Sequence, residues 1–439
     1  MRIPGLVLLA AALSVAVVTE ASALDGLVKP QRSILPNGVV LIVQEHRASD
    51  VVSLQLWLRV GGRDEAAEEL GLSHYLEHML FKGTPTRPTG SIDRFVESVG
   101  GQSNAFTSYD TTHFDLLLPA DQVAPGIELL ADIAVNASFD KTELDRERQV
   151  VLEEMRLTED DPDRFLLRRL AESAFGATPY GQPILGTPPL IERLTRERLA
   201  QYYRKRYSPK SMVLVVVGAV DPKMVRRVAT RTFGTLKGPT LPRVPMPPQP
   251  PITGGRSADV PRPEKQAYLG LAWKAPAVTD RDVFAVDLLT YIIGDSPTSR
   301  LSVAVRDREG LVSEIEAGYI SRQRGGLVYV TARADAENLE NAEAAILRVI
   351  RRVQEEGVTE AERQRAIITA EANYAFDAET SEGLARVWGQ AETTDSIESE
   401  LNYLPTLRQT TAAQIQAAAR TYLGPEFARV RFVPDNAPR

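Results

Sequence analysis

Two histidines four residues apart, with a glutamate between them, are the residues of this sequence best suited to chemistry. They are His74, Glu77 and His78. On a helix, positions i and i+4 share one face, so the two imidazoles could bind one tetrahedral zinc ion. Glu77 leans over that face and could take a proton from a zinc-bound water and pass it to a leaving amine. The order H-x-x-E-H is the inverted zinc-peptidase signature, so the sequence predicts a zinc metalloendopeptidase.

A catalytic zinc needs a third protein ligand and an open fourth position. The helix predicted over Lys141–Thr158 offers several glutamates. Glu147 and Glu154, seven residues apart, fall on its apolar inner stripe, where a carboxylate needs a partner such as a metal. Glu153 points about 100° away from that stripe. The alternative is that all of these glutamates are solvated charges on a long helix.

The stretch His74–Thr84 reads His-Tyr-Leu-Glu-His-Met-Leu-Phe-Lys-Gly-Thr. It resembles the active-site helix of the pitrilysin/insulinase family, which includes the mitochondrial processing peptidases, and the chain is most similar to the short bacterial members. In that family the third zinc ligand is a glutamate about 76 positions after the second histidine, which implies Glu154 here. A second glutamate, seven residues earlier, supports the site in the family, and Glu147 matches it. The resemblance implies one zinc ion per chain.

The segment Gly101–Thr107, Gly-Gln-Ser-Asn-Ala-Phe-Thr, resembles the edge strand on which the family holds its peptide substrate. The resemblance therefore implies that Asn104, Ala105 and Phe106 bind substrate. A peptide would then lie there as an added strand. The alternative is an ordinary junction between a loop and a strand.

The family also takes an arginine and a tyrosine from its second half. Thr298–Leu301 matches the arginine stretch, which implies a catalytic role for Arg300, although a surface arginine is the alternative. The tyrosine position holds Ser313, and Tyr319 is nearby but off the pattern. We therefore expect a homologous partner subunit that carries the Arg/Tyr pair in a heterodimer, with a homodimer as the alternative. A second hypothesis is a catalytically weak structural or peptide-binding subunit of the same fold.

The chain reads as two similar halves joined by a proline-rich linker. The strand-like stretch Ser53–Val60 is echoed by Tyr268–Ala275, and the helix opening Thr142–Arg148 by Thr359–Arg365. The predicted fold class is α+β, with two homologous α/β sandwich domains, mainly antiparallel sheet plus helices, arranged as a clamshell. The predicted boundaries are 24–237 for the zinc-binding domain, 238–265 for the linker and 266–439 for the second domain.

Aligning the two repeats places Leu289, Ile292 and Ile293 opposite the zinc-motif residues His74, Glu77 and His78. Apolar side chains cannot bind zinc, so the second half is expected to be a non-metal lobe that closes over the substrate. The two remaining histidines fit a metal site less well. His46 ends a predicted strand, and His113 begins one.

The N-terminal segment indicates a cell compartment, and composition and charge exclude some classes of site and partner. Residues 1–23 combine Arg2, an apolar run and Ala21-Ser22-Ala23, which predicts a signal peptide cleaved after Ala23 and a periplasmic protein. The chain has no cysteine, which excludes disulfides and thiolate metal sites. The net charge of -7 is spread along the 439 residues without a basic stripe, so we expect no nucleic acid partner. We expect no integral membrane segment, because no other stretch approaches spanning length.

Overall fold

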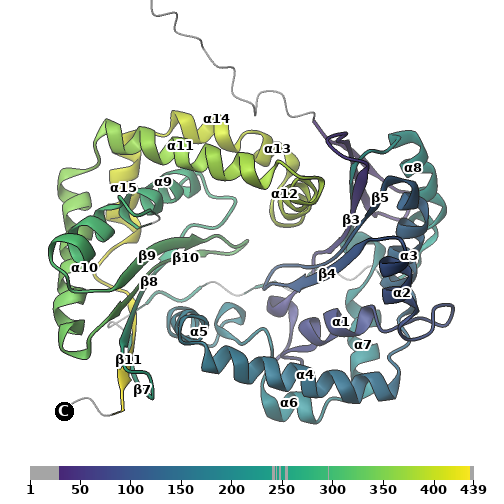
Figure 1. Ribbon diagram of the computed structural model, residues 1–439, viewed down its shortest axis with the longest axis horizontal. Coiled ribbons are helices and arrows are strands. Elements are labelled where there is room, and N and C mark those ends of the chain that lie inside the picture. The colour runs from purple at the N-terminus through teal and green to yellow at the C-terminus, as the bar shows by residue number, and fades with distance from the viewer. Residues whose placement is uncertain are drawn as a thin grey trace, which may run out of the picture.

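The computed structural model describes residues 29–435, apart from 240–242, 244, 247–248, 253–255 and 295. Two mixed sheets, each covered by helices, form two halves that face each other (Figure 1). This arrangement confirms the expected α+β class with two similar units. The predicted signal peptide, residues 1–23, lies outside the described residues. In the part of the chain that is described, no helix has the length and apolar character needed to cross a membrane.

The first sheet has the strand order β1-β2-β6-β3-β5-β4. Strands β2 and β6 are parallel, and the other neighbours are antiparallel. Strand β4 therefore lies at an open edge. The strands are β1 (Gln31–Ile34), β2 (Val40–Glu45), β3 (Val51–Leu58), β4 (Gln102–Thr107), β5 (Thr112–Pro119) and β6 (Met212–Gly218).

The second sheet repeats this order as β7-β11-β8-β10-β9, again with one parallel pair, β7 and β11. Strands β8 and β9 thus correspond to β3 and β4, which explains the repeated sequence patterns. The strands are β7 (Arg256–Arg262), β8 (Ala267–Ala275), β9 (Glu314–Ile320), β10 (Gly326–Ala334) and β11 (Ala428–Pro434).

Helices cover both faces of each sheet. Those of the first half are α1 (Leu72–Leu80), α2 (Ser91–Ser98), α3 (Val123–Asn136), α4 (Lys141–Asp160), α5 (Pro162–Phe175), α6 (Pro188–Glu192), α7 (Arg196–Arg206) and α8 (Pro222–Arg231). Those of the second half are α9 (Val283–Ile293), α10 (Leu339–Glu356), α11 (Glu360–Asp377), α12 (Ser381–Thr394), α13 (Ile397–Leu401), α14 (Tyr403–Gln409) and α15 (Ala412–Tyr422).

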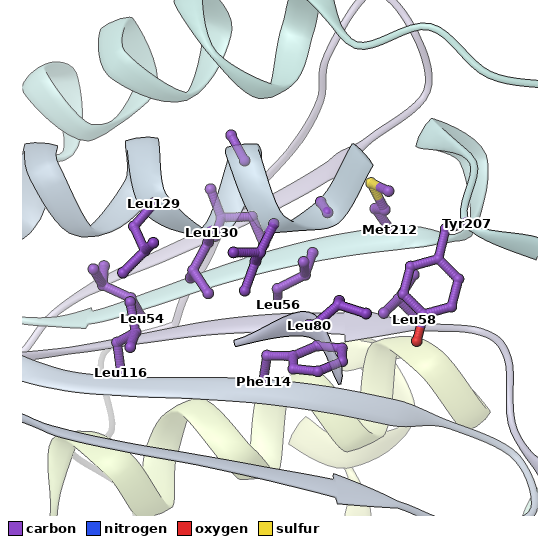
Figure 2. Close-up of a cluster of buried hydrophobic side chains, with 14 of the residues drawn as sticks. Leu54, Leu56, Leu58, Leu80, Phe114, Leu116, Leu129, Leu130, Tyr207 and Met212 are labelled. Carbon is purple, nitrogen blue, oxygen red and sulfur yellow. The ribbon is translucent and has the colours of Figure 1, made fainter. Parts of the chain in front are cut away.

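The core of the first half lies between the sheet and helices α1 and α3. Side chains on one face of β3, such as Leu56 and Leu58, point into this core, because successive residues of a strand face opposite sides. Figure 2 shows Leu80 of α1 close to Leu58 and to Phe114 of β5. This packing holds α1 rigidly against the sheet.

The two halves exchange one helix each. Helix α5 of the first half packs on the second sheet, where Leu166 and Leu170 join Tyr268 and Phe432 in one buried cluster. Close approach depends on Gly270 of β8, because a Cβ there would lie 2.7 Å from Leu170. Helix α5 therefore belongs to the second half by packing, although it precedes the linker in sequence.

Helix α12 of the second half makes the reciprocal contact on the first sheet. Its Leu384 and Trp388 are fully buried against a cluster that includes Ile42 and Trp57. Gly389 lets the helix lie directly on the Trp57 ring, since a Cβ there would come within 2.1 Å of the indole nitrogen. Rotating one half away from the other would expose both clusters. These buried contacts join the second half to the first, and its closing over a substrate stays a prediction.

The predicted linker, 238–265, extends too far toward the C-terminus. Arg256–Arg262 form strand β7, which pairs in parallel with β11. Proline is tolerated there because β7 is an edge strand, where Pro261 need not donate a ladder hydrogen bond.

Candidate metal centre

Helix α1 carries the three residues of the zinc motif. It begins after Gly71, which has a φ of 92°, in the left-handed region that favours glycine. The Glu65 carboxylate accepts hydrogen bonds from the backbone N–H groups of Gly71 (2.8 Å) and Ser73 (2.6 Å), and so satisfies the start of the helix. His74 is buried and His78 half-buried on the side of α1 that meets α4.

Helix α4 supplies the carboxylates. It begins at the Asp140 cap, whose side chain accepts from the backbone N–H groups of Thr142 and Glu143. Glu147 and Glu154, two turns apart, face α1, as their apolar stripe predicts. Glu153 instead pairs with Arg156 in solvent.

His74, His78 and Glu154 converge on one point. The Nε2 atom of each histidine lies 3.4 Å from the same Glu154 oxygen, Oε2. A tetrahedron whose corners lie about 2.1 Å from its centre, the usual zinc–ligand distance, has edges of about 3.4 Å. The three side chains, whose ligand atoms all lie within 4.8 Å of one another, therefore fit a zinc ion.

Glu147 lies behind His78 rather than in this group. Its Oε2 atom is 2.9 Å from His78 Nδ1, and its Oε1 atom is 2.7 Å from the Lys82 ammonium. A carboxylate on the second nitrogen of a metal-binding imidazole orients the ring and makes it a better ligand. Glu147 is therefore placed to support the metal, and Lys82 to hold Glu147 ionised.

The surroundings shift the pKa values of the two histidines in opposite directions. Burial, together with the neighbouring His78, lowers the pKa of His74 to about 4, so this ring stays neutral, as a metal ligand must be. Burial alone would lower the pKa of His78, but hydrogen bonds to Glu147 and Glu154 outweigh it and raise the pKa to about 9. A metal that binds through His78 must therefore displace a proton.

Glu77 is half-buried beside the ligands without being one of them. Burial raises the pKa of its carboxyl group, although a hydrogen bond to the Thr107 hydroxyl opposes that shift. A carboxylate whose pKa is raised in this way is a better proton acceptor near neutral pH. The structure thus places a carboxylate that could accept a proton next to the candidate metal position.

Lys82 and Thr107 near the site were missed from the sequence, and His113, which fitted a metal site less well, also lies near Glu77. Lys82 could have been found from its spacing, since it follows His78 by four positions. Thr107 and His113 carry no such signal, because β4 and β5 bring them close to Glu77 only through the sheet register. His113 is buried and stacks on Trp57, with ring centroids 4.1 Å apart, whereas His46 lies elsewhere and contacts Ser381.

The predicted substrate residues Asn104, Ala105 and Phe106 lie on β4, the open edge of the first sheet. Asn104 is exposed, and 57% of Phe106 is exposed. Strand β4 faces the space between the halves in Figure 1. An edge strand has one row of unpaired backbone groups, which is what an added peptide strand requires.

The structure does not bring the predicted catalytic residue Arg300 to the metal group. Its guanidinium forms a bidentate ion pair with Glu362, with Nε 2.7 Å from Oε1 and Nη2 2.8 Å from Oε2. It also donates to the carbonyl of Gly357. The Thr359 cap at the start of α11 holds Glu362 in place. Arg300 therefore ties the α9–β9 connection to α11 and is not brought to the zinc-motif residues.

Neither candidate for the tyrosine role lies at the metal group. Ser313 is exposed at the start of β9, and its hydroxyl donates to the carbonyl of Arg333. The Tyr319 hydroxyl donates to the carbonyl of Pro276 at 2.7 Å. In the second half, Leu289 and Ile293 of α9 are fully buried in the core, as their apolar character requires.

A cavity of about 480 Å³ adjoins the metal group and is shared between the halves. His74 and Thr107 form its boundary with the metal group, and Met155, Ile184 and Leu327 are among its apolar walls. Such a cavity beside β4 can accept a large apolar side chain.

Comparisons with known proteins agree with this geometry. The sequence profile described as Insulinase (Peptidase family M16) matches residues 40–188, and the profile described as Peptidase M16 inactive domain matches residues 193–369. An uncharacterized zinc protease of Mycobacterium leprae is 30% identical over 337 residues, which are 75% of each chain. The chain belongs to peptidase family M16. Another relative, an uncharacterized zinc protease of Mycobacterium tuberculosis, is 28% identical over 93% of this chain and 94% of its own length.

Solved structures show the same two-domain M16 fold. A protease from Helicobacter pylori superposes with a TM-score of 0.88 at 24% identity, covering 92% of this chain and 99% of its own. The first half of the periplasmic protease PqqL from Escherichia coli superposes with a TM-score of 0.76 at 21% identity, over 93% of this chain and 92% of that one. The match of the second half to a profile described as inactive accords with its apolar residues at the zinc-motif positions.

Proposed function

We propose that this M16 chain is a zinc-dependent endopeptidase or oligopeptidase that cuts flexible peptides. The observation that carries the proposal is the convergence of His74, His78 and Glu154 at zinc–ligand spacing, with Glu77 beside them. The names of its relatives, zinc proteases, support the same reading. Zinc bound there would supply Lewis acidity, which acidifies water and polarises a peptide carbonyl.

The side chains of the chain divide the remaining work. Glu77 accepts a proton from the attacking water and delivers it to the leaving amine, a role that suits a half-buried carboxylate with a raised pKa. Glu147 orients the His78 ring through its Nδ1 atom. The open edge of β4 binds the peptide backbone as an added strand, and Asn104 lies where it can contact that backbone.

We also propose that a second, homologous two-domain subunit faces this chain and that the two together enclose the peptide in a closed chamber. This chain corresponds in fold and size to a structure described as the first half of a periplasmic protease. Its own halves share buried clusters through α5 and α12, so opening them would expose apolar side chains. Neither Ser313 nor Tyr319 brings a phenol to the metal group. A partner that carries the Arg/Tyr pair would supply this phenol and would close over the substrate.

The last part of the proposal concerns location. The predicted signal peptide over 1–23 would export the chain to the periplasm. Mass measurement of the mature N-terminus in a periplasmic extract tests this part, and a chain that retains Met1 in the cytoplasm would refute it.

Zinc content tests the metal site. The purified protein should hold about one zinc per chain. His74→Ala, His78→Ala and Glu154→Gln should each lose it, whereas Glu153→Gln, a matched change on the same helix, should keep it. Full zinc content in Glu154→Gln would refute the ligand assignment.

Adding the candidate partner tests the assembly. Loss of one transition-state donor typically costs about 10²- to 10³-fold in rate, so the chain alone should cleave peptides slowly and the partner should raise turnover without changing zinc content. Fast cleavage by the isolated monomer would refute the partner requirement. A zinc-loaded complex that binds but never cuts peptides would favour the structural or peptide-binding subunit.

A further inference from the structure

A buried arginine of the second half lines the cavity beside the metal group. Arg322, in the turn between β9 and β10, borders the same cavity of about 480 Å³ as the metal ligand His74. It is only 9% exposed. Among the residues that the structure describes, no carboxylate forms an ion pair with it, and its guanidinium donates only from Nη1, to the Tyr180 carbonyl at 3.3 Å. Because buried charges in proteins are normally paired, this guanidinium can take an anion from outside the chain.

Three aromatic rings of the first half hold the Arg322 guanidinium in place. Its Cζ atom lies 4.2 Å from the centre of the Tyr109 ring, 4.9 Å from that of Tyr180 and 5.1 Å from that of Phe175. The Tyr109 hydroxyl donates to the Gln182 carbonyl at 2.8 Å, which fixes this ring. Stacking on aromatic rings stabilises a buried guanidinium but leaves its in-plane N–H groups available. Arg322 is therefore preorganised to donate hydrogen bonds.

The free N–H groups of Arg322 point to the cavity beside the metal group. Its Nε and Nη2 atoms have no acceptor in the described part of the chain, yet neither is sealed from open space. Tyr109, on which the guanidinium stacks, also lines this cavity. Arg322 borders a second cavity as well, of about 590 Å³, but none of the three rings lines that one. The guanidinium therefore belongs to the cavity that His74 shares.

The other arginines of this cavity already have carboxylate partners. Arg168 lies 3.2 Å from Glu159, which lines the cavity too, and Arg164 lies 3.3 Å from Asp161. Arg322 is thus the lining arginine whose charge is left for a ligand.

The cavity suits a peptide group that has an apolar stem and an anionic end. Met155, Ile184 and Leu327 form apolar walls, and Arg322 adds the cation. One guanidinium can donate two parallel hydrogen bonds to a carboxylate, and such charged pairs are strong where water is excluded. Strand β4 borders the cavity through Phe106, so a peptide added to β4 could place one of its residues there.

We propose that Arg322 is a specificity-determining residue that binds a carboxylate of the peptide substrate in this cavity. The inference rests on the proposed function and names its substrate class, which is flexible peptides with an acidic group close to the bond that is cut. A Glu or Asp side chain and the carboxyl terminus of a peptide present the same two oxygens. The second half, which lacks the zinc-motif residues at the aligned positions of α9, thereby contacts the substrate directly.

Matched peptides test the proposal, with zinc-loaded protein and a partner if one is required. In the first series, an unstructured peptide with an amidated end carries Glu or Gln at each position around the bond that is cut. In the second series, peptides without acidic residues end in a free carboxylate or an amide. In one series the carboxylate should raise kcat/KM about 10- to 100-fold, since a hydrogen bond to a charged group is typically worth this much. The series that responds identifies the source of the carboxylate, and no preference in either series would overturn the proposal.

Arg322→Leu should abolish this preference, because it keeps an apolar side chain among the rings and removes the donors. The matched control is Arg164→Leu, which removes an exposed and already paired cation from the same cavity and should keep the preference. A preference that survives in Arg322→Leu, or that both variants lose equally, would mean that Arg322 is only structural. If Arg322→Leu does not fold, Arg322→Lys replaces it. Lysine keeps the charge but not the paired donors, so the preference should fall, and an unchanged preference would overturn the proposal.

Peptide binding gives a readout that does not depend on cleavage. In zinc-loaded Glu77→Gln, the Kd of an acidic peptide from the responding series should be about 10- to 100-fold lower than that of its neutral counterpart. The difference should vanish when Arg322→Leu is added. Equal Kd values for acidic and neutral peptides in both series overturn the role of Arg322. A zinc-loaded wild type that binds acidic peptides selectively but cuts none under any condition refutes the proposed function instead.

Discussion

Replacing Glu147 by glutamine should weaken zinc binding without removing a ligand. Both carboxylate oxygens are in use, one on His78 Nδ1 at 2.9 Å and one on Lys82 at 2.7 Å. An amide can keep only one of these contacts, because its NH₂ group must face either the imidazole N–H or the ammonium. The NH₂ group of the glutamine would then face a second hydrogen-bond donor, in a site where the Glu147 side chain is only 10% exposed.

The size of the effect follows from the role of such partners. Loss of a carboxylate on the outer nitrogen of a metal-bound histidine typically weakens metal binding about 10- to 100-fold. This corresponds to about 1.4–2.7 kcal/mol of binding free energy. The zinc Kd, measured by competition with a chromogenic chelator, should rise by that factor.

Glu153→Gln is the matched control for Glu147→Gln. It removes the same charge from the same helix, but its carboxylate is 55% exposed and pairs with Arg156. Its zinc Kd should equal that of the wild type. If Glu147→Gln bound zinc as tightly as the wild type, or if both variants weakened binding equally, the supporting role of Glu147 would be refuted.

Three further predictions concern the whole chain. Trp388→Ala should lower the free energy of unfolding by about 3–5 kcal/mol, because a fully buried side chain is removed. Calorimetry should still show one unfolding transition, because α12 joins both halves. Two separate transitions in the wild type would contradict the shared clusters. Burial raises the pKa of Asp287 from 3.8 to about 6, so the folded state binds its proton more tightly and the wild type should lose stability as pH rises from about 4 to 6. Asp287→Asn should flatten that slope, and an identical slope in denaturant titrations would refute the assignment. The enzyme should cut an unfolded substrate protein but not the same protein in its native state. Equal cleavage rates of the two forms, measured by mass spectrometry, would rule out an enclosed chamber.

Much of the metal site could be predicted because it depends on local spacing. The motif predicted that His74 and His78 share one face of a helix, and α1 spans Leu72–Leu80. The apolar stripe of α4 singled out Glu147 and Glu154, since helical periodicity alone decides which residues share a face. The resemblance to the family then distinguished the ligand from the supporting carboxylate, a choice that spacing had left open.

Features that depend on long-range contacts could not be predicted in the same way. The apolar face of α5 shows that the helix packs on something, but not that it packs on the other half's sheet. Arg300 was assigned from a motif, whereas its partner Glu362 becomes close only through folding. Strand β7 lies in a proline-containing stretch of the sequence. None of its residues is fully buried, as is common for an edge strand, so its sequence has only a weak strand pattern.

The most direct test of the central claim is the rate of peptide cleavage by Glu77→Gln at full zinc occupancy, assayed with a partner if the wild type requires one. The account predicts that this variant holds as much zinc as the wild type, because Glu77 is not a ligand, and cleaves an unstructured peptide at least about 100-fold more slowly, because the general base is lost. Wild-type cleavage by zinc-loaded Glu77→Gln would contradict the proposal that this M16 chain hydrolyses peptides through Glu77.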